Sequence, residues 1–274
     1  MTRPLLVGIV NITEDSFSDG RRYLDPAAAI AQARRLVAGG ADIIELGAVA
    51  SNVAAKSVAP ADEIRRLEPV IAAVAADRIP LSVDSFAPET QRFALARGVA
   101  YLNDIQGFPD PAIYPDLAAA SCRLIVMHAS QRRGRAQRLD LGPDEVWQRI
   151  EDFFAERIPQ LERAGVHRER LVLDPGMGFF LSSRPEPSLQ VLAGLGRLKR
   201  AFGLPVLVSV SRKSFLAALT GHDAPDKLGP ASLAAELFAA AQGADFIRTH
   251  APAALRDALL IVEALAAAAD LISD

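Results

Sequence analysis

Cysteine is almost absent from this 274-residue sequence, in which Cys122 is the only one. No disulfide can form within the chain, so a reducing compartment suits it. The sequence also lacks any run of about 18 apolar residues, the length of a membrane helix, and its first apolar stretch is too short for a signal peptide. The formal net charge is −3, whereas surfaces that bind nucleic acids are basic. We therefore expect a cytoplasmic protein with neither a nucleic-acid nor a membrane partner.

The short motifs of several common enzyme classes are missing as well. No G-x-G-x-x-G follows the first apolar run, and neither a P-loop nor a G-x-S-x-G turn occurs. These absences argue against dinucleotide-binding, NTPase and common hydrolase sites. The four histidines, at positions 128, 167, 222 and 250, show no zinc-binding spacing. A zinc site is therefore not expected.

The sequence does contain a regular alternation of short apolar runs and longer helix-like stretches. Eight candidate strands occupy residues 5–10, 41–47, 80–85, 100–105, 123–128, 170–175, 205–211 and 245–250. Eight candidate helices occupy residues 25–40, 59–77, 87–98, 110–121, 142–165, 186–203, 228–244 and 251–270. Buried strands joined by helices indicate a parallel sheet, and eight such units predict an α/β fold, a TIM (β/α)8 barrel forming a single domain over residues 1–274. An open, doubly wound sheet is the alternative.

Polar residues stand at the ends of nearly all the candidate strands. They are Asn11, Asp84, Asn103, Asp104, His128, Asp174, Ser211, Arg212, Lys213, Arg248, Thr249 and His250. Any one of them could cap a helix. In a barrel, however, the carboxyl ends of all strands surround one mouth, where the active site lies. We therefore expect these side chains to meet around a single cavity.

These residue types suggest two kinds of contact. Lys213, Arg248 and His250 form a cationic set suited to phosphate oxygens. Asp84, Asn103 and Asp174 suit the hydrogen-bonding edge of a flat, donor-rich heterocycle. We expect the two sets to face opposite ends of the ligand. Lys213 could alternatively form a Schiff base, although its position after the strand and beside Arg212 favours binding.

Seven segments, in order and spacing, resemble the sequence blocks of the dihydropteroate synthase family. They are GIVNITEDSFSDG (8–20), SVDS (82–85), YLNDI (101–105), IVMH (125–128), LDPGMGF (173–179), SVSRKSF (209–215) and FIRTH (246–250). The resemblance covers nearly the whole chain. It implies a pterin-binding (β/α)8 transferase of folate biosynthesis. Such an enzyme condenses 6-hydroxymethyl-7,8-dihydropterin diphosphate with 4-aminobenzoate, giving 7,8-dihydropteroate and pyrophosphate.

The resemblance also implies roles for individual residues. Catalytic positions are Asp84, Asp174 and Lys213, which with Asn103 and Met127 form the pterin pocket. The diphosphate is expected at Asn11, Arg248, Thr249 and His250, with Asn11 also near Mg²⁺. The 4-aminobenzoate site is expected at Ser51, Phe179, Phe180 and Ser214. The family usually forms homodimers through late helices, and the apolar segment 232–244 allows this.

Two departures from the family pattern resemble its sulfonamide-insensitive, mobile Sul group. Residues 47–54 read GAVASNVA, so Asn52 stands where an arginine is usual and only Ser51 keeps the usual hydroxyl. Phe180 adds aromatic bulk beside Phe179, which could exclude ligands larger than 4-aminobenzoate. We therefore expect sulfonamide resistance. Alternatives are a sulfonamide-sensitive chromosomal synthase, a pterin-binding corrinoid methyltransferase, a non-catalytic pterin-binding protein and a Schiff-base aldolase.

Overall fold

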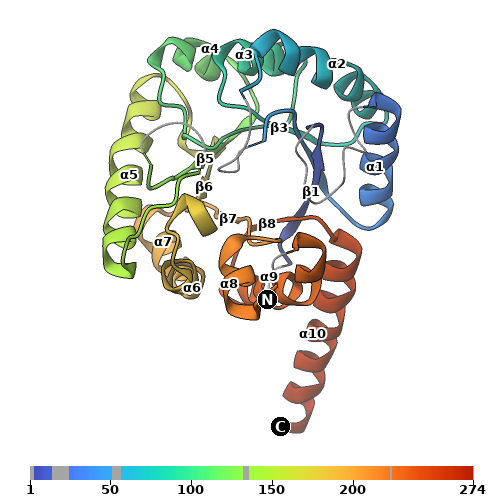
Figure 1. Ribbon diagram of the computed structural model, residues 1–274, viewed down its shortest axis with the longest axis vertical. Coiled ribbons are helices and arrows are strands. Elements are labelled where there is room, and N and C mark those ends of the chain that lie inside the picture. The colour runs from blue at the N-terminus through green and yellow to red at the C-terminus, as the bar shows by residue number, and fades with distance from the viewer. Residues whose placement is uncertain (1–2, 14–24, 51–56, 132–135, 223, 274) are drawn as a thin grey trace.

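Eight parallel strands surround the centre of the molecule (Figure 1). The computed structural model describes residues 3–13, 25–50, 57–131, 136–222 and 224–273. The strands are β1 (Leu5–Asn11), β2 (Ile43–Gly47), β3 (Leu81–Asp84), β4 (Tyr101–Asp104), β5 (Arg123–Met127), β6 (Leu171–Asp174), β7 (Leu207–Val208) and β8 (Phe246–Thr249). They pair in the order β6-β5-β4-β3-β2-β1-β8-β7. A bridge between Leu173 and Val206 joins β6 to the segment before β7, which confirms the predicted barrel.

Helices form a ring outside these strands (Figure 1). They are α1 (Pro26–Ala38), α2 (Pro60–Ala76), α3 (Pro88–Ala96), α4 (Tyr114–Ala119), α5 (Pro143–Arg163), α6 (Pro185–Ala193), α7 (Leu195–Phe202), α8 (Ser214–Thr220), α9 (Gly229–Ala241) and α10 (Pro252–Ser273). Short 3-10 helices are η1 (Pro111–Ile113), η2 (Arg168–Arg170), η3 (Gly178–Phe180) and η4 (Pro225–Leu228). Proline in the first turn starts most of the α-helices, because its fixed φ suits that position and its missing N–H is not needed there.

Three local features differ from the sequence expectations. The helix expected at 186–203 is two helices, α6 and α7, which are separated at Gly194. A Cβ at Gly194 would lie 2.3 Å from the Trp147 ring, so close packing of α5 requires glycine there. An additional helix, α8, follows β7. Strand β7 itself is only two residues long, because residues 209–213 leave the ladder to form a turn.

Apolar side chains fill both sides of the barrel wall. A small cluster lies inside the barrel and consists of Val7, Ile43, Ile125, Val172, Leu207 and Phe246. A much larger cluster lies between the strands and the helices. On α5, for example, Trp147, Ile150, Phe154 and Ile158 are buried at helical spacing. The strands are therefore packed on both faces, which fixes the position of the residues at their carboxyl ends.

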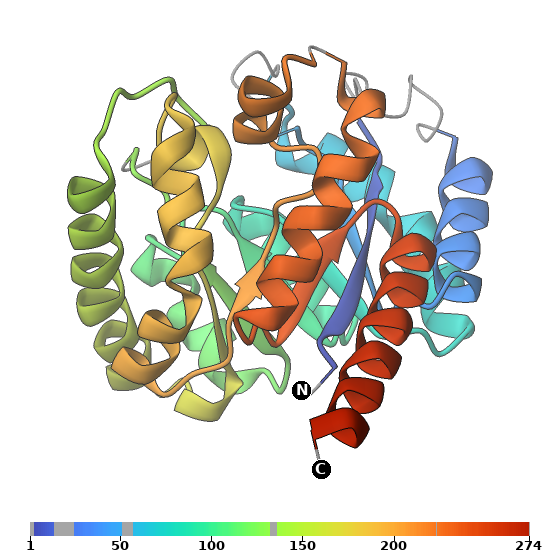
Figure 2. The same cartoon turned by 90° about the horizontal axis from the view of Figure 1, so that it is seen from below.

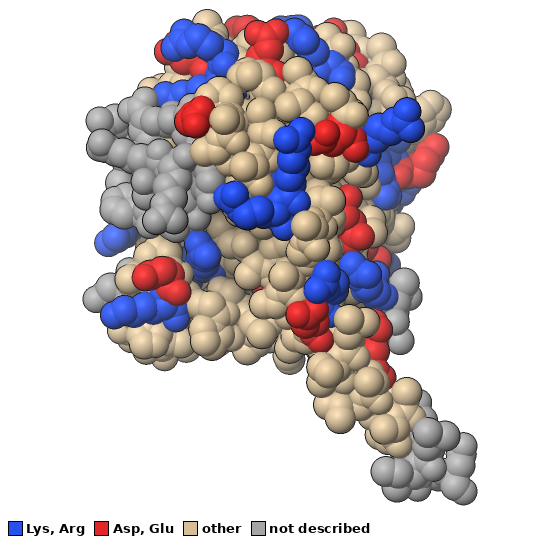
Figure 3. Space-filling model, turned by 90° about the vertical axis from the view of Figure 1, so that its right-hand side faces the viewer, with Lys and Arg blue, Asp and Glu red and all other residues tan. Residues whose placement is uncertain are grey.

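Helix α10 extends past the rest of the barrel (Figure 2). The part of this helix that projects in Figure 3 carries mainly uncharged residues. Leu260, Ile261 and Leu265 of α10 are more than half exposed. Across the described residues, no helix combines the length and the apolar character needed to cross a membrane.

Candidate active site

The polar residues at the carboxyl ends of the strands lie directly above the apolar cluster inside the barrel. Side chains alternate between the two faces of a strand. The residue two positions after each member of that cluster, and the one two positions after Tyr101, which packs against it, therefore also point inward and form the next layer. This layer contains Ile9, Glu45, Asn103, Met127, Asp174, Ser209 and Arg248. The predicted pterin residues Asn103, Met127 and Asp174 thus share one level with Arg248.

Glu45 is at the centre of this layer and was not predicted from the sequence. Its carboxylate accepts hydrogen bonds from Ser82 Oγ (2.8 Å) and Asn103 Nδ2 (3.2 Å), and it forms an ion pair with Arg248 Nε. Arg248 Nη2 also lies 3.5 Å from Asp84 Oδ2. The cation is therefore held between two carboxylates. The two charge sets that we expected to face opposite ends of the ligand are interleaved at this point.

Burial alters the ionisation of the carboxyl groups at the mouth. Burial and the negative charge of Glu45 raise the pKa of Asp84, and Arg248 opposes this shift. Burial raises the pKa of Asp174 to about 6, against a hydrogen bond from the Gly176 amide (2.8 Å) and the positive charge of Lys213. Neighbouring hydrogen-bond donors and cations, rather than water, therefore stabilise the ionised forms of both carboxyl groups. Such shifted pKa values are common in functional sites.

Lys213 lies at the edge of an aromatic and apolar wall. Its Nζ lies 5.2 Å from the centroid of the Phe180 ring, a cation–π contact. Phe180 packs with Ile105 and Met127 in a buried cluster. Burial, and then the charge of Arg248, lowers the pKa of Lys213 to about 8. The structure thus brings together Lys213 and Met127, both predicted to face the pterin.

Two glycines let the loop after β6 approach its neighbours closely. Gly176 has a φ of 75°, and a Cβ there would lie 2.4 Å from the His128 carbonyl oxygen. Gly178 has a φ of 65°, and a Cβ there would lie 2.8 Å from Ser214 Oγ. Phe179 is partly exposed, with Arg138 over its ring at 5.3 Å. Phe179, Phe180 and Ser214, predicted to bind 4-aminobenzoate, therefore come from adjoining segments.

The three residues at the end of β8 face different directions. Arg248 points into the barrel, and His250 Nδ1 lies 3.0 Å from Ser211 Oγ. Thr249 is fully buried, its hydroxyl oxygen accepts a hydrogen bond from the Ala251 amide (3.1 Å), and β8 contacts α9. The Thr249 side chain thus lies against the outer helices rather than at the predicted diphosphate site, as strand alternation requires.

Asn11 lies at the end of β1, beside the same mouth. A Cβ at Gly47 would lie 3.7 Å from Asn11 Oδ1 and 3.9 Å from the Asp84 Cβ, so the three positions are neighbours. Ser51 and Asn52 lie outside the described residues.

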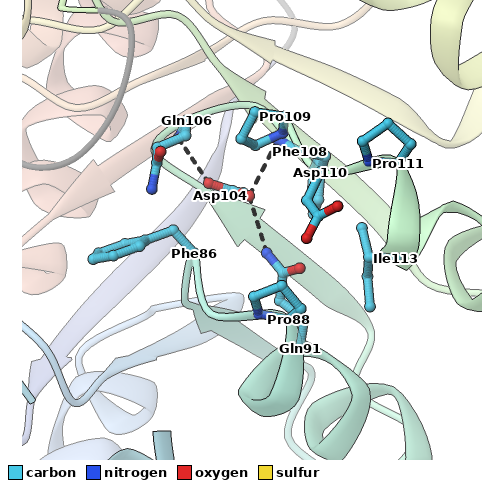
Figure 4. Close-up of a pocket in the computed structure, with 10 residues that line it drawn as sticks. All are labelled: Phe86, Pro88, Gln91, Asp104, Gln106, Phe108, Pro109, Asp110, Pro111 and Ile113. Atoms are coloured by element: carbon cyan, nitrogen blue, oxygen red, sulfur yellow. Dashed lines mark hydrogen bonds between the residues drawn. The ribbon is translucent and has the colours of Figure 1, made fainter. Parts of the chain in front are cut away.

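Asp104, also at a strand end, has a different environment from Asp174. Burial raises its pKa to about 6. It accepts hydrogen bonds from Gln91 Nε2 (3.0 Å) and from the amides of Gln106 (2.7 Å) and Phe108 (3.1 Å), as Figure 4 shows. These bonds fold the loop after β4 beside a pocket of about 320 Å³. Asp104 therefore anchors this loop, which agrees with the capping role considered from the sequence.

Comparison with known proteins identifies the family. A family model described as pterin binding enzyme matches residues 7–250. The chain is 58% identical to the Escherichia coli dihydropteroate synthase type-2, over 97% of this chain and 97% of that protein. The Xanthomonas albilineans dihydropteroate synthase with 4-aminobenzoic acid superimposes with a TM-score of 0.87 and 38% identity, covering 97% and 94% of the two chains. The same enzyme in complex with 7,8-dihydropteroate gives a TM-score of 0.82 and 36% identity, covering 97% and 95%. The chain therefore belongs to the pterin-binding enzymes and is a transferase of the dihydropteroate synthase family.

Proposed function

We propose that this protein joins 4-aminobenzoate to 6-hydroxymethyl-7,8-dihydropterin diphosphate. A C–N bond forms between the arylamine nitrogen and the pterin methylene, the C–O bond to the diphosphate breaks, and the amine loses a proton. The observation that carries the proposal is the meeting of Asn103, Asp174, Lys213 and Arg248 at one barrel mouth. The homologue solved both with 4-aminobenzoic acid and with 7,8-dihydropteroate supports the same substrates.

The pterin ring is assigned to the layer above the apolar cluster. Asn103 Oδ1 is buried without a hydrogen-bond partner among the described residues, and it is suited to accept a hydrogen bond from an amino group of the ligand. Asp174 and Asp84 accept further hydrogen bonds, Lys213 donates to the pterin carbonyl, and Met127 covers one face of the ring. The arylamine is neutral at pH 7, so the protein acts by positioning and electrostatics without a covalent nucleophile.

Departure of the diphosphate requires positive charge beside the leaving group. Arg248 and His250 are assigned to this role. Mg²⁺ is proposed as the cofactor, bound mainly by diphosphate oxygens with Asn11 as a protein ligand. The donor set fits this arrangement, because Asn11 Oδ1 offers an amide oxygen at the mouth, beside Gly47 and Asp84. Mg²⁺ that keeps water and phosphate ligands needs few protein oxygens, and it would neutralise charge on the leaving group.

Pyrophosphate release tests this function directly. The purified protein should release pyrophosphate from the pterin diphosphate only when 4-aminobenzoate is present, and should form one dihydropteroate for each pyrophosphate. Release that is independent of 4-aminobenzoate would point to a hydrolase and overturn the proposal.

Sulfonamide resistance is the finer part of the proposal, and it rests on Phe180 and the altered segment 47–54. Phe180 is buried in a cluster with Met127 and lies 5.2 Å from Lys213 Nζ, while Phe179 is partly exposed. Phe180 is thus the more deeply buried of the two rings. Phe179, the more exposed ring, is the one that limits the space for a sulfonamide substituent.

Inhibition by sulfamethoxazole tests the resistance. The inhibition constant of the wild-type protein should exceed the 4-aminobenzoate KM by at least about tenfold, equivalent to about 1.4 kcal/mol. Deleting Phe180 together with Leu181 should reduce that ratio. Strong inhibition of the wild-type protein near its substrate affinity would end the resistance proposal while leaving the synthase function intact.

We also propose a homodimer and a cytoplasmic location. Leu219, Phe238 and Leu260, on three late helices, are each more than 40% exposed, and α9 contacts α10. Large exposed apolar groups on neighbouring helices suit an interface. Sedimentation should give twice the chain mass of 29.2 kDa, and Phe238→Lys should shift the protein toward the monomer.

A further inference from the structure

The Glu45 side chain on β2 binds side chains from three other strands. Its Oε1 accepts a hydrogen bond from Arg248 Nε on β8. Its Oε2 accepts from Ser82 Oγ on β3 (2.8 Å) and from Asn103 Nδ2 on β4 (3.2 Å). Glu45 has no exposed surface. Its two oxygens are therefore held by three donors of the protein, and the carboxylate cannot turn toward a ligand without breaking these bonds.

The contact with Glu45 determines the orientation of the Asn103 amide. Glu45 forms an ion pair with Arg248, and a carboxylate can only accept hydrogen bonds. The NH2 group of Asn103 must therefore face Glu45, and the carbonyl oxygen Oδ1 must lie on the other side of the amide. Turning the amide over would place two oxygens opposite each other and would remove the hydrogen bond.

The oriented Oδ1 of Asn103 has no partner in the described parts of the protein. Asn103 is 2% exposed, and no donor of the described residues bonds this oxygen. Buried acceptors are nearly always paired in folded proteins. Asn103 also belongs to the inward layer above the apolar cluster of the barrel. An acceptor that is both fixed and unpaired thus lies in the layer to which the pterin ring is assigned.

We infer that Glu45 is a positioning residue that makes Asn103 select a ligand with a ring N–H donor. Arg248 and Ser82 hold Glu45, Glu45 holds the amino group of Asn103, and Oδ1 is left to accept from the ring. The inference rests on the proposed function in one respect, namely that this ring is the pterin. A ring that presents a lone pair at the same point would face Oδ1 without a hydrogen between them, so it would be rejected.

Replacing Glu45 by Gln should reverse the Asn103 amide. The new side-chain oxygen should take the side of Arg248, because an NH2 group there would face the Arg248 Nε–H. The new NH2 group would then face Asn103, whose Oδ1 must turn to accept from it. The Asn103 NH2 group would turn to the ligand, where two donors would meet and no hydrogen bond could form.

Side-chain ¹⁵N–¹H signals test the orientation in the ligand-free protein. Selective labelling gives only three side-chain amide signals, because the sequence contains three asparagines, at positions 11, 52 and 103. The Asn103 signal is the one that Asn103→Asp removes. In the wild-type protein one of its protons should lie downfield, as a hydrogen bond to a carboxylate requires. Glu45→Gln should abolish this downfield shift.

Binding of 6-hydroxymethyl-7,8-dihydropterin, measured by isothermal titration calorimetry, tests the selection. This compound lacks the diphosphate, so its affinity reports contacts with the ring. Glu45→Gln should weaken its binding at least about 20-fold. Glu63→Gln is the matched control, because Glu63 on α2 is also buried and bonded to a hydroxyl, that of Thr90 (2.7 Å). It should keep the affinity within about twofold of wild type and leave the Asn103 signal unchanged.

Exchanging the two side chains separates positioning from a general loss of packing. Asn103→Asp alone places two carboxylates against each other and should also weaken pterin binding. In the double variant, Glu45→Gln with Asn103→Asp, the new NH2 group can donate to one oxygen of the new carboxylate, and the other oxygen can accept from the ring. The double variant should therefore bind the pterin at least about fivefold more tightly than either single variant, whereas two independent losses would add.

Three results would overturn the inference: a wild-type Asn103 signal without the downfield proton, equal weakening by Glu63→Gln, or a double variant that binds no better than the single variants. The first decides the matter even if Glu45→Gln does not fold. If all results are as expected but the enzyme forms no dihydropteroate, the proposed function fails and the positioning role stands.

Discussion

Glu45 and Arg248 form a buried ion pair that joins β2 to β8 across the barrel. The side chain of Glu45 is fully buried and that of Arg248 is 15% exposed, so little water reaches the pair. Such a pair adds little to stability compared with apolar packing, but removing one partner leaves the other charge buried and uncompensated. This asymmetry makes the pair a sensitive test of the site geometry.

Replacing Glu45 by Gln leaves Arg248 with only the longer contact to Asp84 (3.5 Å), so it should lower the free energy of unfolding by about 3 kcal/mol, as measured by urea denaturation. Asp77→Asn is the control, because it breaks the exposed pair between Asp77 and Arg34 (2.7 Å) and should change stability far less. Equal effects of the two substitutions would show that Arg248 is not confined by Glu45.

Gly176→Ala should displace the loop after β6. The left-handed φ alone costs about 1–2 kcal/mol with alanine. The new Cβ would also lie 2.4 Å from the His128 carbonyl oxygen, so the loss should be larger than that, and the 4-aminobenzoate KM should rise. Gly98→Ala is the matched control, since its φ of 69° is similar and no atom lies within 4 Å of the added Cβ. The unfolding free energy of Gly98→Ala should fall only by the cost of the left-handed φ. A larger fall would contradict the explanation that the Gly176 effect comes from the close contact with His128.

His128 should make the protein sensitive to acid. Burial lowers its pKa from 6.5 to about 4, and its Nδ1 bonds the Pro175 carbonyl oxygen at 3.0 Å. Between these two pH values the unfolded chain binds the proton and the folded protein does not, so stability falls as the pH drops from 6.5 to 4. The loss is at most about 3 kcal/mol.

The His128 effect must be measured as a difference between the wild-type protein and a variant. Buried carboxyl groups with raised pKa values, such as Asp174, stabilise the folded protein as the pH falls through the same range and so mask the effect of His128. His128→Asn should be more stable relative to wild type at pH 4.5 than at pH 7.5. A difference that does not vary with pH would exclude the effect.

Lys213 should make substrate binding depend on pH in the alkaline range. Its pKa is lowered to about 8, so it loses its positive charge as the pH rises through that value. The KM of the pterin diphosphate should therefore rise between pH 7.5 and 9, and Lys213→Arg should remove this rise because arginine stays charged. A wild-type KM that is constant over this range would show that the Lys213 charge does not contribute.

The fold and most of the mouth could be predicted because seven of the eight strand ends are visible in the sequence as polar residues after apolar runs. Glu45 was missed because it lies inside such a run, although a carboxylate in the middle of a buried strand is itself a signal. The outward direction of Thr249 follows from strand alternation once Arg248 is placed inward. The break at Gly194 could not be predicted, because it depends on contact with Trp147, 47 residues away in the sequence.

Binding of the pterin diphosphate to Asp174→Asn, measured by isothermal titration calorimetry beside Asp104→Asn, tests the central claim most directly. Both carboxyl groups are buried at strand ends with pKa values of about 6, but only Asp174 faces Lys213 and Arg248 inside the barrel. Asp174→Asn should weaken binding at least about 100-fold, about 2.7 kcal/mol, whereas Asp104→Asn should stay within about threefold of wild type. Equal affinities of the two variants would contradict the assignment of the substrate to the barrel mouth.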